Sequence, residues 1–269
     1  MHNIICEMVV ILYNPSEEQV AHLHQYANLG YFRRIYVYDN SAKALNVDRL
    51  PTTVEYHFMN SNRGLSIPYN MALKDAIDNG ADYLCVMDQD SEFSGDDIEK
   101  ILSYLEENNC TELNTAVVCP IIETDENKQE TQHKKGVEII KWTINSGSFL
   151  NLALLKKNSI SYAEKVFLDG VDYDFCYSIH KKKLKILRLN ESKLFQTFGY
   201  RSGKSSFTKH NASRYYNIAH NRKYILKKHY GIAGWLVAAL ANIRLSMRIL
   251  LNEESKREKV LACIKGIFK

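Results

Sequence analysis

The sequence predicts an α/β protein in which a mixed, mostly parallel sheet is covered on both faces by helices. Two observations support this fold class. Segments rich in apolar and β-branched residues alternate with segments of helical periodicity through the first half of the chain. The strand-like segments are apolar without interruption, which is typical of strands buried on both faces of a parallel sheet.

The first strand is predicted in residues 7–13, EMVVILY, which a polar turn terminates. Ser16, followed by two glutamates, is a good helix N-cap, and helical periodicity then continues until Gly30. The same patterns predict strands in 34–41, 53–59, 81–91, 115–122 and 184–189, and helices in 67–80, 96–109 and 171–183. The stretch 137–158 predicts a strand, a central turn and a short helix.

The sequence also predicts two domains, with the boundary near residue 230. Residues 1–230 hold the sheet, and 231–269 form a basic helical extension. Its segment GIAGWLVAALANI is apolar, but Arg244 and Arg248 interrupt it before it reaches roughly 20 residues, the length needed to span a bilayer. We therefore expect amphipathic helices that dock on a membrane surface, or that pack against the enzyme or another subunit.

Charge is distributed unevenly along the chain. Residues 181–269 contain 21 Lys and Arg against 4 acidic residues, whereas the first 180 residues contain 14 against 27. A basic region of this kind indicates an anionic partner: a membrane surface, a nucleic acid or a phosphorylated substrate. The cations near the apolar segment that anionic lipid would attract are Lys227, Lys228, Lys256, Arg257 and Lys259.

The cysteines and the N-terminal segment favour a cytoplasmic protein. The six cysteines form no CxxC pair, and several lie in apolar segments, as reduced core thiols do. The segment MHNIICEMVVILYN has neither a basic start nor a signal cleavage pattern. Together with the basic extension, this predicts a peripheral location at the inner face of the cell membrane.

Two aspartates follow the strand predicted in 81–91. Asp88 and Asp90 in VMDQDS point to the same face of an extended chain. Ligands of open parallel sheets bind beyond the carboxyl ends of the strands, and two carboxylates there can hold Mg²⁺ or Mn²⁺ together with substrate phosphates. An ordinary acidic turn is the alternative interpretation.

A second acidic stretch, FLDGVDYDFC, precedes the helix predicted in 171–183. Acidic residues are common at helix N-termini because the helix dipole favours them, and Asp169 is the expected cap. A general base is the other interpretation, which requires one carboxylate to reach a substrate hydroxyl.

An ordered series of motifs resembles a known enzyme family. The segments YNP, YDNS, NRGLSIPYNMAL and VMDQDS are followed by INSGSFLN, FLDGVDYDFC, FQTFG and RYYNIAHNRKYIL. In this order they resemble the family 2 glycosyltransferases of the Rossmann-like GT-A fold over residues 1–230. The resemblance is greatest to bacterial rhamnosyltransferases, which build surface polysaccharides such as O-antigen and capsule.

The resemblance implies a role for each matching residue. Asp172 corresponds to the catalytic base, Asp174 is a supporting acid, and Gly147 lies close to the donor sugar. The implied ligands of Mg²⁺ or Mn²⁺ are Asp90, Asp88 and Gln196. The residues implied to bind the nucleotide are Tyr13, Asp39, Asn62, Gly64, Asn70 and Asp88.

The implied reaction is a single inverting displacement. Asp172 removes the proton of an acceptor hydroxyl, which attacks the anomeric carbon while the metal stabilises the departing diphosphate. Recognition of a pyrimidine by Asp39 fits dTDP- and UDP-linked donors. Rhamnose is the sugar that the resemblance favours, with a UDP-hexose or galactofuranose as alternatives, and the acceptor is expected to be a polyprenyl-diphosphate-linked saccharide.

The sequence departs from the family pattern at three positions. Gln196 replaces a metal-binding histidine, while Ser178 and His220 replace arginines. The cations that could compensate for the lost charge are Arg201, Lys204 and Arg222. A degenerate transferase that binds nucleotide without turnover is therefore an alternative interpretation.

Two other protein classes share part of the pattern. A nicotinamide-dependent oxidoreductase has the same α/β alternation, but no predicted strand is followed by GxGxxG. A nucleic-acid-binding protein would explain the basic region, yet no RNP, KH or zinc motif is present, and the acidic first half would repel phosphates. We therefore expect no nucleic-acid partner, and the oligomeric state is left open.

Overall fold

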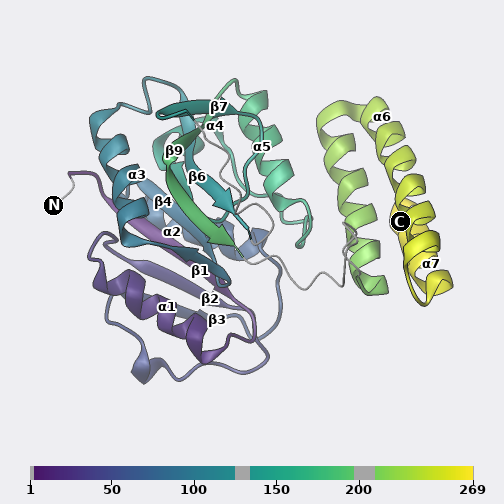
Figure 1. Ribbon diagram of the computed structural model, residues 1–269, viewed down its shortest axis with the longest axis horizontal. Coiled ribbons are helices and arrows are strands. Elements are labelled where there is room, and N and C mark those ends of the chain that lie inside the picture. Colours follow the sequence, from purple (N-terminus) through teal and green to yellow (C-terminus); the bar gives the residue numbers. More distant parts are fainter. Residues whose placement is uncertain (1–2, 125–133, 197–209, 269) are drawn as a thin grey trace.

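The computed structural model describes residues 3–124, 134–196 and 210–268. Within them, nine strands form one sheet in the order β3-β2-β1-β4-β8-β6-β9-β5, with β7 paired to β9 (Figure 1). The strands are β1 (Cys6–Leu12), β2 (Ile35–Asp39), β3 (Val54–Phe58), β4 (Tyr83–Asp88), β5 (Ser91–Phe93), β6 (Thr115–Glu123), β7 (Val137–Ile140), β8 (Ser148–Asn151) and β9 (Lys185–Gln196). The α-helices are α1 (Glu17–Asn28), α2 (Ser66–Asp78), α3 (Gly95–Glu107), α4 (Leu152–Asn158), α5 (Val171–Lys181), α6 (Ala212–Asn252) and α7 (Lys256–Phe268).

The first four neighbours in the sheet, β3, β2, β1 and β4, are parallel throughout. β8 runs antiparallel between β4 and β6, and β9 is parallel to β6. All residues of β1 and β2 are buried. The fold class predicted from the sequence, a mixed sheet covered by helices, is therefore confirmed.

Alternate residues of β1 point into two cores on opposite faces of the sheet. Val9 and Ile11 belong to the core that is covered by α2, α4 and α5. Met8 and Val10 belong to the core that is covered by α1 and α3. Because both faces are covered, these strands need apolar side chains at every position, which explains the uninterrupted apolar segments of the sequence.

Two short strands differ from the sequence prediction. The sequence prediction places β8 in a turn and a helix. It places Ser91 of β5 at the end of the strand in 81–91 and assigns residues 92 and 93 to no element. All four residues of β8 are buried, since the strand is inserted between β4 and β6. Such short buried segments form strands because of their neighbours in the sheet, and periodicity alone does not identify them.

The C-terminal helices fold into an antiparallel unit beside the sheet domain (Figure 1). Gly231 has non-helical backbone angles and interrupts α6. Asn242, in the second half of α6, is fully buried and donates a hydrogen bond of 3.1 Å to the carbonyl of Ala219 in the first half. α7 packs against the first half as well, because a Cβ at Gly266 would lie 2.6 Å from the Tyr216 carbonyl.

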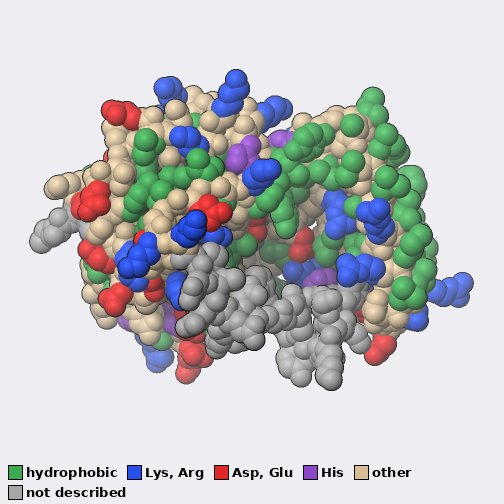
Figure 2. Space-filling view, turned by 45° about the horizontal axis from the view of Figure 1, so that its top comes forward, with side chains coloured by type: hydrophobic (Ala, Val, Ile, Leu, Met, Phe, Trp, Pro, Cys, Tyr) green, Lys and Arg blue, Asp and Glu red, His purple; other side chains and the backbone are tan. Residues whose placement is uncertain are grey.

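The second half of α6 carries an outward apolar face. Gly234, Asn242 and Ile249 of this half are buried, whereas most of its large apolar residues are exposed. These exposed residues are Ile232, Leu236, Val237, Leu240, Ile243, Met247, Leu250 and Leu251. Figure 2 shows hydrophobic side chains along the outer side of the C-terminal helices. By length and composition α6 could cross a membrane: the mean hydropathy of its most apolar window is 1.4, and 22% of that window is buried.

Gly64 provides a test of how the loop after β3 is packed. Both Gly64 and Gly30 have positive φ, but a Cβ at Gly64 would lie 2.1 Å from the Phe167 carbonyl oxygen, whereas a Cβ at Gly30 meets nothing within 4 Å. We expect Gly30→Ala to lower the free energy of unfolding by about 1 kcal/mol, and Gly64→Ala by at least about 2 kcal/mol more. Urea denaturation measures both values, and equal losses would contradict the close packing.

Candidate active site

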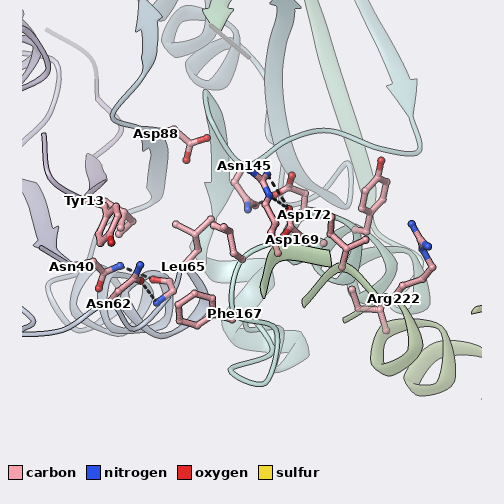
Figure 3. Close-up of a pocket in the computed structure, with 18 of the residues that line it drawn as sticks. Tyr13, Asn40, Asn62, Leu65, Asp88, Asn145, Phe167, Asp169, Asp172 and Arg222 are labelled. Carbon is pink, nitrogen blue, oxygen red and sulfur yellow. Dashed lines mark hydrogen bonds and ion pairs between the residues drawn. The ribbon is translucent and has the colours of Figure 1, made fainter. Parts of the chain in front are cut away.

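One cavity of about 960 Å³ lies at the carboxyl ends of β1, β2 and β4 and extends to α5 and α6. Its lining includes seven of the residues singled out in the sequence: Tyr13, Asn62, Gly64, Asp88, Asp90, Asp172 and Gln196. Figure 3 shows Tyr13, Asn40 and Asn62 at one end, Asn145 and Asp172 in the middle, and Arg222 at the other end. The strand ends therefore bring together residues that are more than 150 positions apart in the chain.

Asp88 terminates β4 and is held by neutral hydrogen-bond donors. The Tyr69 hydroxyl donates to its Oδ1 at 3.1 Å, and the Gln196 amide donates to its Oδ2 at 3.3 Å. Burial, together with the charge of Asp90, raises the pKa of Asp88 to about 6. Burial also raises the pKa of Asp90. Within the described part of the chain, no basic group contributes to either shift.

These residues fit a divalent cation. The Gln196 Oε1 atom is buried without a hydrogen-bond partner, beside two carboxylates that destabilise each other's charge. A hard cation such as Mg²⁺ or Mn²⁺ prefers oxygen ligands of this kind and compensates carboxylate charge. The described residues contain no cluster of three or more His, Cys, Asp and Glu side chains suited to a metal, so the donor set depends on the amide oxygen.

Asp172 lies in the first turn of α5, after the left-handed Gly170. Its Oδ1 accepts a hydrogen bond of 2.5 Å from the Asn145 amide (Figure 3). Burial, followed by the charge of Asp88, raises the pKa of Asp172 to about 7. A carboxylate with such a pKa is balanced between its two protonation states near neutral pH, as a general base requires.

The end of the cavity near β1 and β2 presents polar groups and one aromatic ring. Tyr13 is half-exposed there, and its backbone N–H donates to the Gln89 side chain at 2.7 Å. The Asn40 amide donates to the Gly64 carbonyl at 2.8 Å, and Asn62 accepts from the Gly64 N–H at 2.9 Å. These bonds fix the loop that lines this end of the cavity.

Four predicted residues do not line this cavity. Asp39 is fully buried, and its oxygens accept hydrogen bonds from the Tyr56 hydroxyl at 2.6 Å and the Ser41 N–H at 2.8 Å. Asp39 is thus bonded within the framework, and its contact with a pyrimidine stays a prediction. The Asn70 side chain instead donates a hydrogen bond to the Tyr162 carbonyl and accepts one from the Tyr162 N–H.

Gly147 and Asp174 also lie outside the cavity lining and pack within the protein. Gly147 has a positive φ, and a Cβ there would lie 2.7 Å from Leu194, behind the cavity wall. Asp174 is buried and points to α6, where Lys228 and His229 contact its carboxylate at 2.8 Å. Although burial opposes it, these hydrogen bonds lower the pKa of Asp174. In this structure Asp174 joins α5 to α6 rather than contacting the cavity.

The sequence reasoning missed several lining residues. Asn40 follows Asp39 at the end of β2, and Asn145 lies just before the turn at Gly147, so both positions were close to recognised motifs. Of the α6 residues, the sequence points only to Arg222, as a cation that could compensate for lost charge, because the distance of α6 from the strand ends is set by tertiary packing. Those that line the cavity are Arg214, Ile218, Arg222, Ile225, Leu226 and Ala241.

The other departures from the family pattern lie outside the cavity lining. The Ser178 hydroxyl donates to the Asp174 carbonyl within α5, and the His220 ring stacks on Tyr216. Arg201 and Lys204, like the residues that follow Gln196 in the FQTFG motif, fall outside the described residues.

Comparisons with known proteins agree with this geometry. The sequence profile described as "Glycosyl transferase family 2" matches residues 9–210, and the chain belongs to this family. No curated protein sequence matches the chain significantly. Its fold is of the GT-A type.

Solved structures show the same fold. The structure of S. aureus TarS 1–349 in complex with UDP-GlcNAc is 16% identical, with a TM-score of 0.59 over 98% of this chain and 82% of that one. The structure of GalNAc-T7 with UDP, GalNAc and Mn²⁺ is 10% identical, with a TM-score of 0.58 over 86% of this chain. This chain spans 51% of the GalNAc-T7 chain.

Because the pKa of Asp172 is raised, we expect Asp172→Asn to increase the free energy of unfolding in a pH-dependent way when no metal is bound. The folded protein keeps this proton up to about pH 7, whereas the unfolded chain releases it near pH 4. The stability contributed by the protonated acid is thus complete below pH 4 and is lost as the pH rises through 7. In EDTA, the free energy of unfolding of Asp172→Asn should exceed that of the wild type by on the order of 1–3 kcal/mol at pH 8. The two values should be nearly equal at pH 4.

Asp174→Asn is the matched control, because the pKa of Asp174 is lowered. Its substitution should destabilise the protein above pH 4, and the difference should disappear as the pH falls. Urea denaturation at several pH values measures both effects. A gain from Asp172→Asn that is independent of pH would contradict the assigned pKa.

Proposed function

We propose that this protein is a metal-dependent inverting glycosyltransferase that moves a sugar from a pyrimidine nucleoside diphosphate to a saccharide acceptor. The arrangement of Asp172 opposite Asp88 and Asp90 in one cavity is the observation that carries this proposal. A base on one side and a metal-binding pair on the other suit a displacement in which a hydroxyl attacks as a diphosphate leaves.

The proposed roles follow from the contacts of each residue. Asp172 takes the acceptor proton on its carboxylate, and the Asn145 amide fixes the orientation of that carboxylate. The metal site would be formed by Asp88, Asp90 and the Gln196 Oε1 atom. When bound, the cation supplies positive charge next to the diphosphate. Tyr13, Asn40 and Asn62 are placed to hold the nucleoside.

The nucleotide and the sugar of the donor each have more than one candidate. The motif series favours dTDP-rhamnose, in a pathway that builds surface polysaccharide. Among the structural neighbours, TarS has been solved with UDP-GlcNAc, and GalNAc-T7 with UDP and GalNAc. A UDP-linked N-acetylhexosamine is therefore the main alternative to rhamnose, beside the UDP-hexose and galactofuranose that the sequence left open.

Thermal melting with UDP, dTDP and GDP, each with and without Mn²⁺, tests the proposal. A ligand at about 100 times its dissociation constant adds about 2.7 kcal/mol to the folded state. We expect a Mn²⁺-dependent rise in Tm with UDP or dTDP, which Asp90→Ala abolishes.

Turnover is measured in the same proteins as release of the nucleoside diphosphate from dTDP-rhamnose, UDP-GlcNAc and UDP-galactose. Asp172→Asn should keep the Mn²⁺-dependent rise in Tm but lower kcat by about 10²–10⁴-fold, the usual contribution of a general base. Binding without turnover in the wild type would instead identify a degenerate transferase, and no nucleotide binding would refute the proposal.

We also propose that the protein is peripheral at the cytoplasmic face of the membrane, where a polyprenyl-diphosphate-linked acceptor would be available. The apolar residues exposed on the second half of α6, the α6 face, support this proposal. Exposed residues of α7 add to this surface: Leu261, Ile264 and Phe268. The exposed Arg244 and Arg248 lie on the same segment of α6 and suit anionic headgroups, which favours an interfacial position over spanning.

Liposome co-sedimentation checks the membrane proposal. The double substitution Leu240→Glu and Met247→Glu changes two exposed side chains of the α6 face, so it should weaken binding to phosphatidylglycerol vesicles by about tenfold or more without lowering Tm. The matched control is Val137→Glu with Ile139→Glu, which changes exposed apolar residues of β7. Equal binding by the two double variants would contradict the α6 face as the contact.

A further inference from the structure

The first half of α6 presents alternating cationic and apolar side chains to the cavity. Arg214, Ile218 and Arg222 follow one another at intervals of four, and Ile225 and Leu226 continue the same face. This face forms the wall of the cavity opposite the strand ends. The charge partners of its cations therefore decide what the wall can bind.

Two cations of this helix are neutralised by the sheet domain. Arg214 forms an ion pair of 3.1 Å with Asp169, and Lys228 forms one of 2.8 Å with Asp174. Arg222 differs from both. Among the described residues no carboxylate lies within ion-pair distance of Arg222, and its guanidinium donates to the neutral Asn242 amide oxygen at 2.6 Å.

The environment of Arg222 is unfavourable for an isolated charge. The side chain is half-buried, and burial lowers the pKa of its guanidinium. Asn242, its partner, is itself fully buried and also bonded to the Ala219 carbonyl. A guanidinium has five N–H groups in a planar fork, so most of its donors remain available to an anion that enters the cavity.

The position of Arg222 separates it from the nucleotide end of the cavity. Figure 3 shows Asp172 between Arg222 and the group formed by Tyr13, Asn40 and Asn62. An anion bound at Arg222 therefore lies on the acceptor side of the proposed base. The side chains around it on α6 are apolar: Ile218, Ile225, Leu226 and Ala241.

We propose that Arg222 binds the phosphate of an acceptor in which a phosphate or diphosphate ester joins the saccharide to an apolar chain. The inference rests on the proposed function, because it uses Asp172 to define the acceptor side. The guanidinium fork matches phosphate geometry, and the apolar wall of α6 accommodates the start of the chain.

Calorimetric titration of the full chain with geranyl diphosphate tests the proposal, with and without saturating UDP and Mn²⁺. Geraniol and inorganic pyrophosphate are titrated in parallel, and both should bind more weakly than geranyl diphosphate. Arg222→Gln should weaken geranyl diphosphate binding by about tenfold or more, and Arg222→Lys, which keeps the charge but not the fork, by less.

Lys227→Gln is the matched control, since it removes one positive charge from an exposed position of the same helix outside the cavity lining. It should leave the dissociation constant unchanged, and Tm confirms that each variant is folded. Equal losses in Arg222→Gln and Lys227→Gln, or wild-type binding by Arg222→Gln, would overturn the proposal. Equal binding of pyrophosphate and geranyl diphosphate would reduce the site to one for free anions and would also overturn it.

A loss of the UDP-dependent rise in Tm in Arg222→Gln would assign the arginine to the donor diphosphate and overturn the proposal as well. Failure of the wild type to bind both UDP and dTDP would refute the proposed function instead. The titration without nucleotide would still report on Arg222, so the two failures can be distinguished.

Discussion

The convergence of three carboxylates, Asp88, Asp90 and Asp172, is the constraint on which the active site depends. Burial raises the pKa of each of them, and mutual repulsion adds to the shift for Asp88 and Asp172. Within the described residues, the side-chain partners of Asp88 and Asp172 are the neutral Tyr69, Gln196 and Asn145, so the negative charge there suits a bound cation. With neutral partners, Asp172 keeps a pKa near neutral pH. Burying this carboxyl group lowers the stability of the fold and leaves the group ready for proton transfer.

The helix α5 connects this site to the C-terminal helices. Asp172 and Asp174 are two positions apart, so they lie on different faces of the helix and have opposite surroundings. Asp172 faces the cavity and meets another acid, whereas Asp174 is buried against Lys228 and His229. Because removing one partner of a buried ion pair is strongly destabilising, this contact holds α6 against the domain that carries the base.

The C-terminal helices combine a small apolar core, which includes Ile249 and Cys263, with the buried polar groups of Asn242 and Glu253. Many of their other large apolar side chains face outward. The buried Glu253 carboxylate accepts from the Tyr215 hydroxyl and from Lys259 at 2.6 Å, which ties α7 to both halves of α6. One helical unit can therefore complete the cavity on its inner side and present an apolar surface on its outer side.

The sequence by itself determined the sheet, the helices around it and the acidic motifs, because apolar periodicity and strand-end chemistry are local properties. VMDQDS and FLDGVDYDFC identified Asp88, Asp90 and Asp172, which line one cavity in the structure. Only the tertiary structure decided that Asp39, Asn70, Gly147 and Asp174 lie in the framework and that Arg222 lines the cavity. Burial and the choice of charge partner depend on how distant segments pack, and a linear pattern does not record that packing.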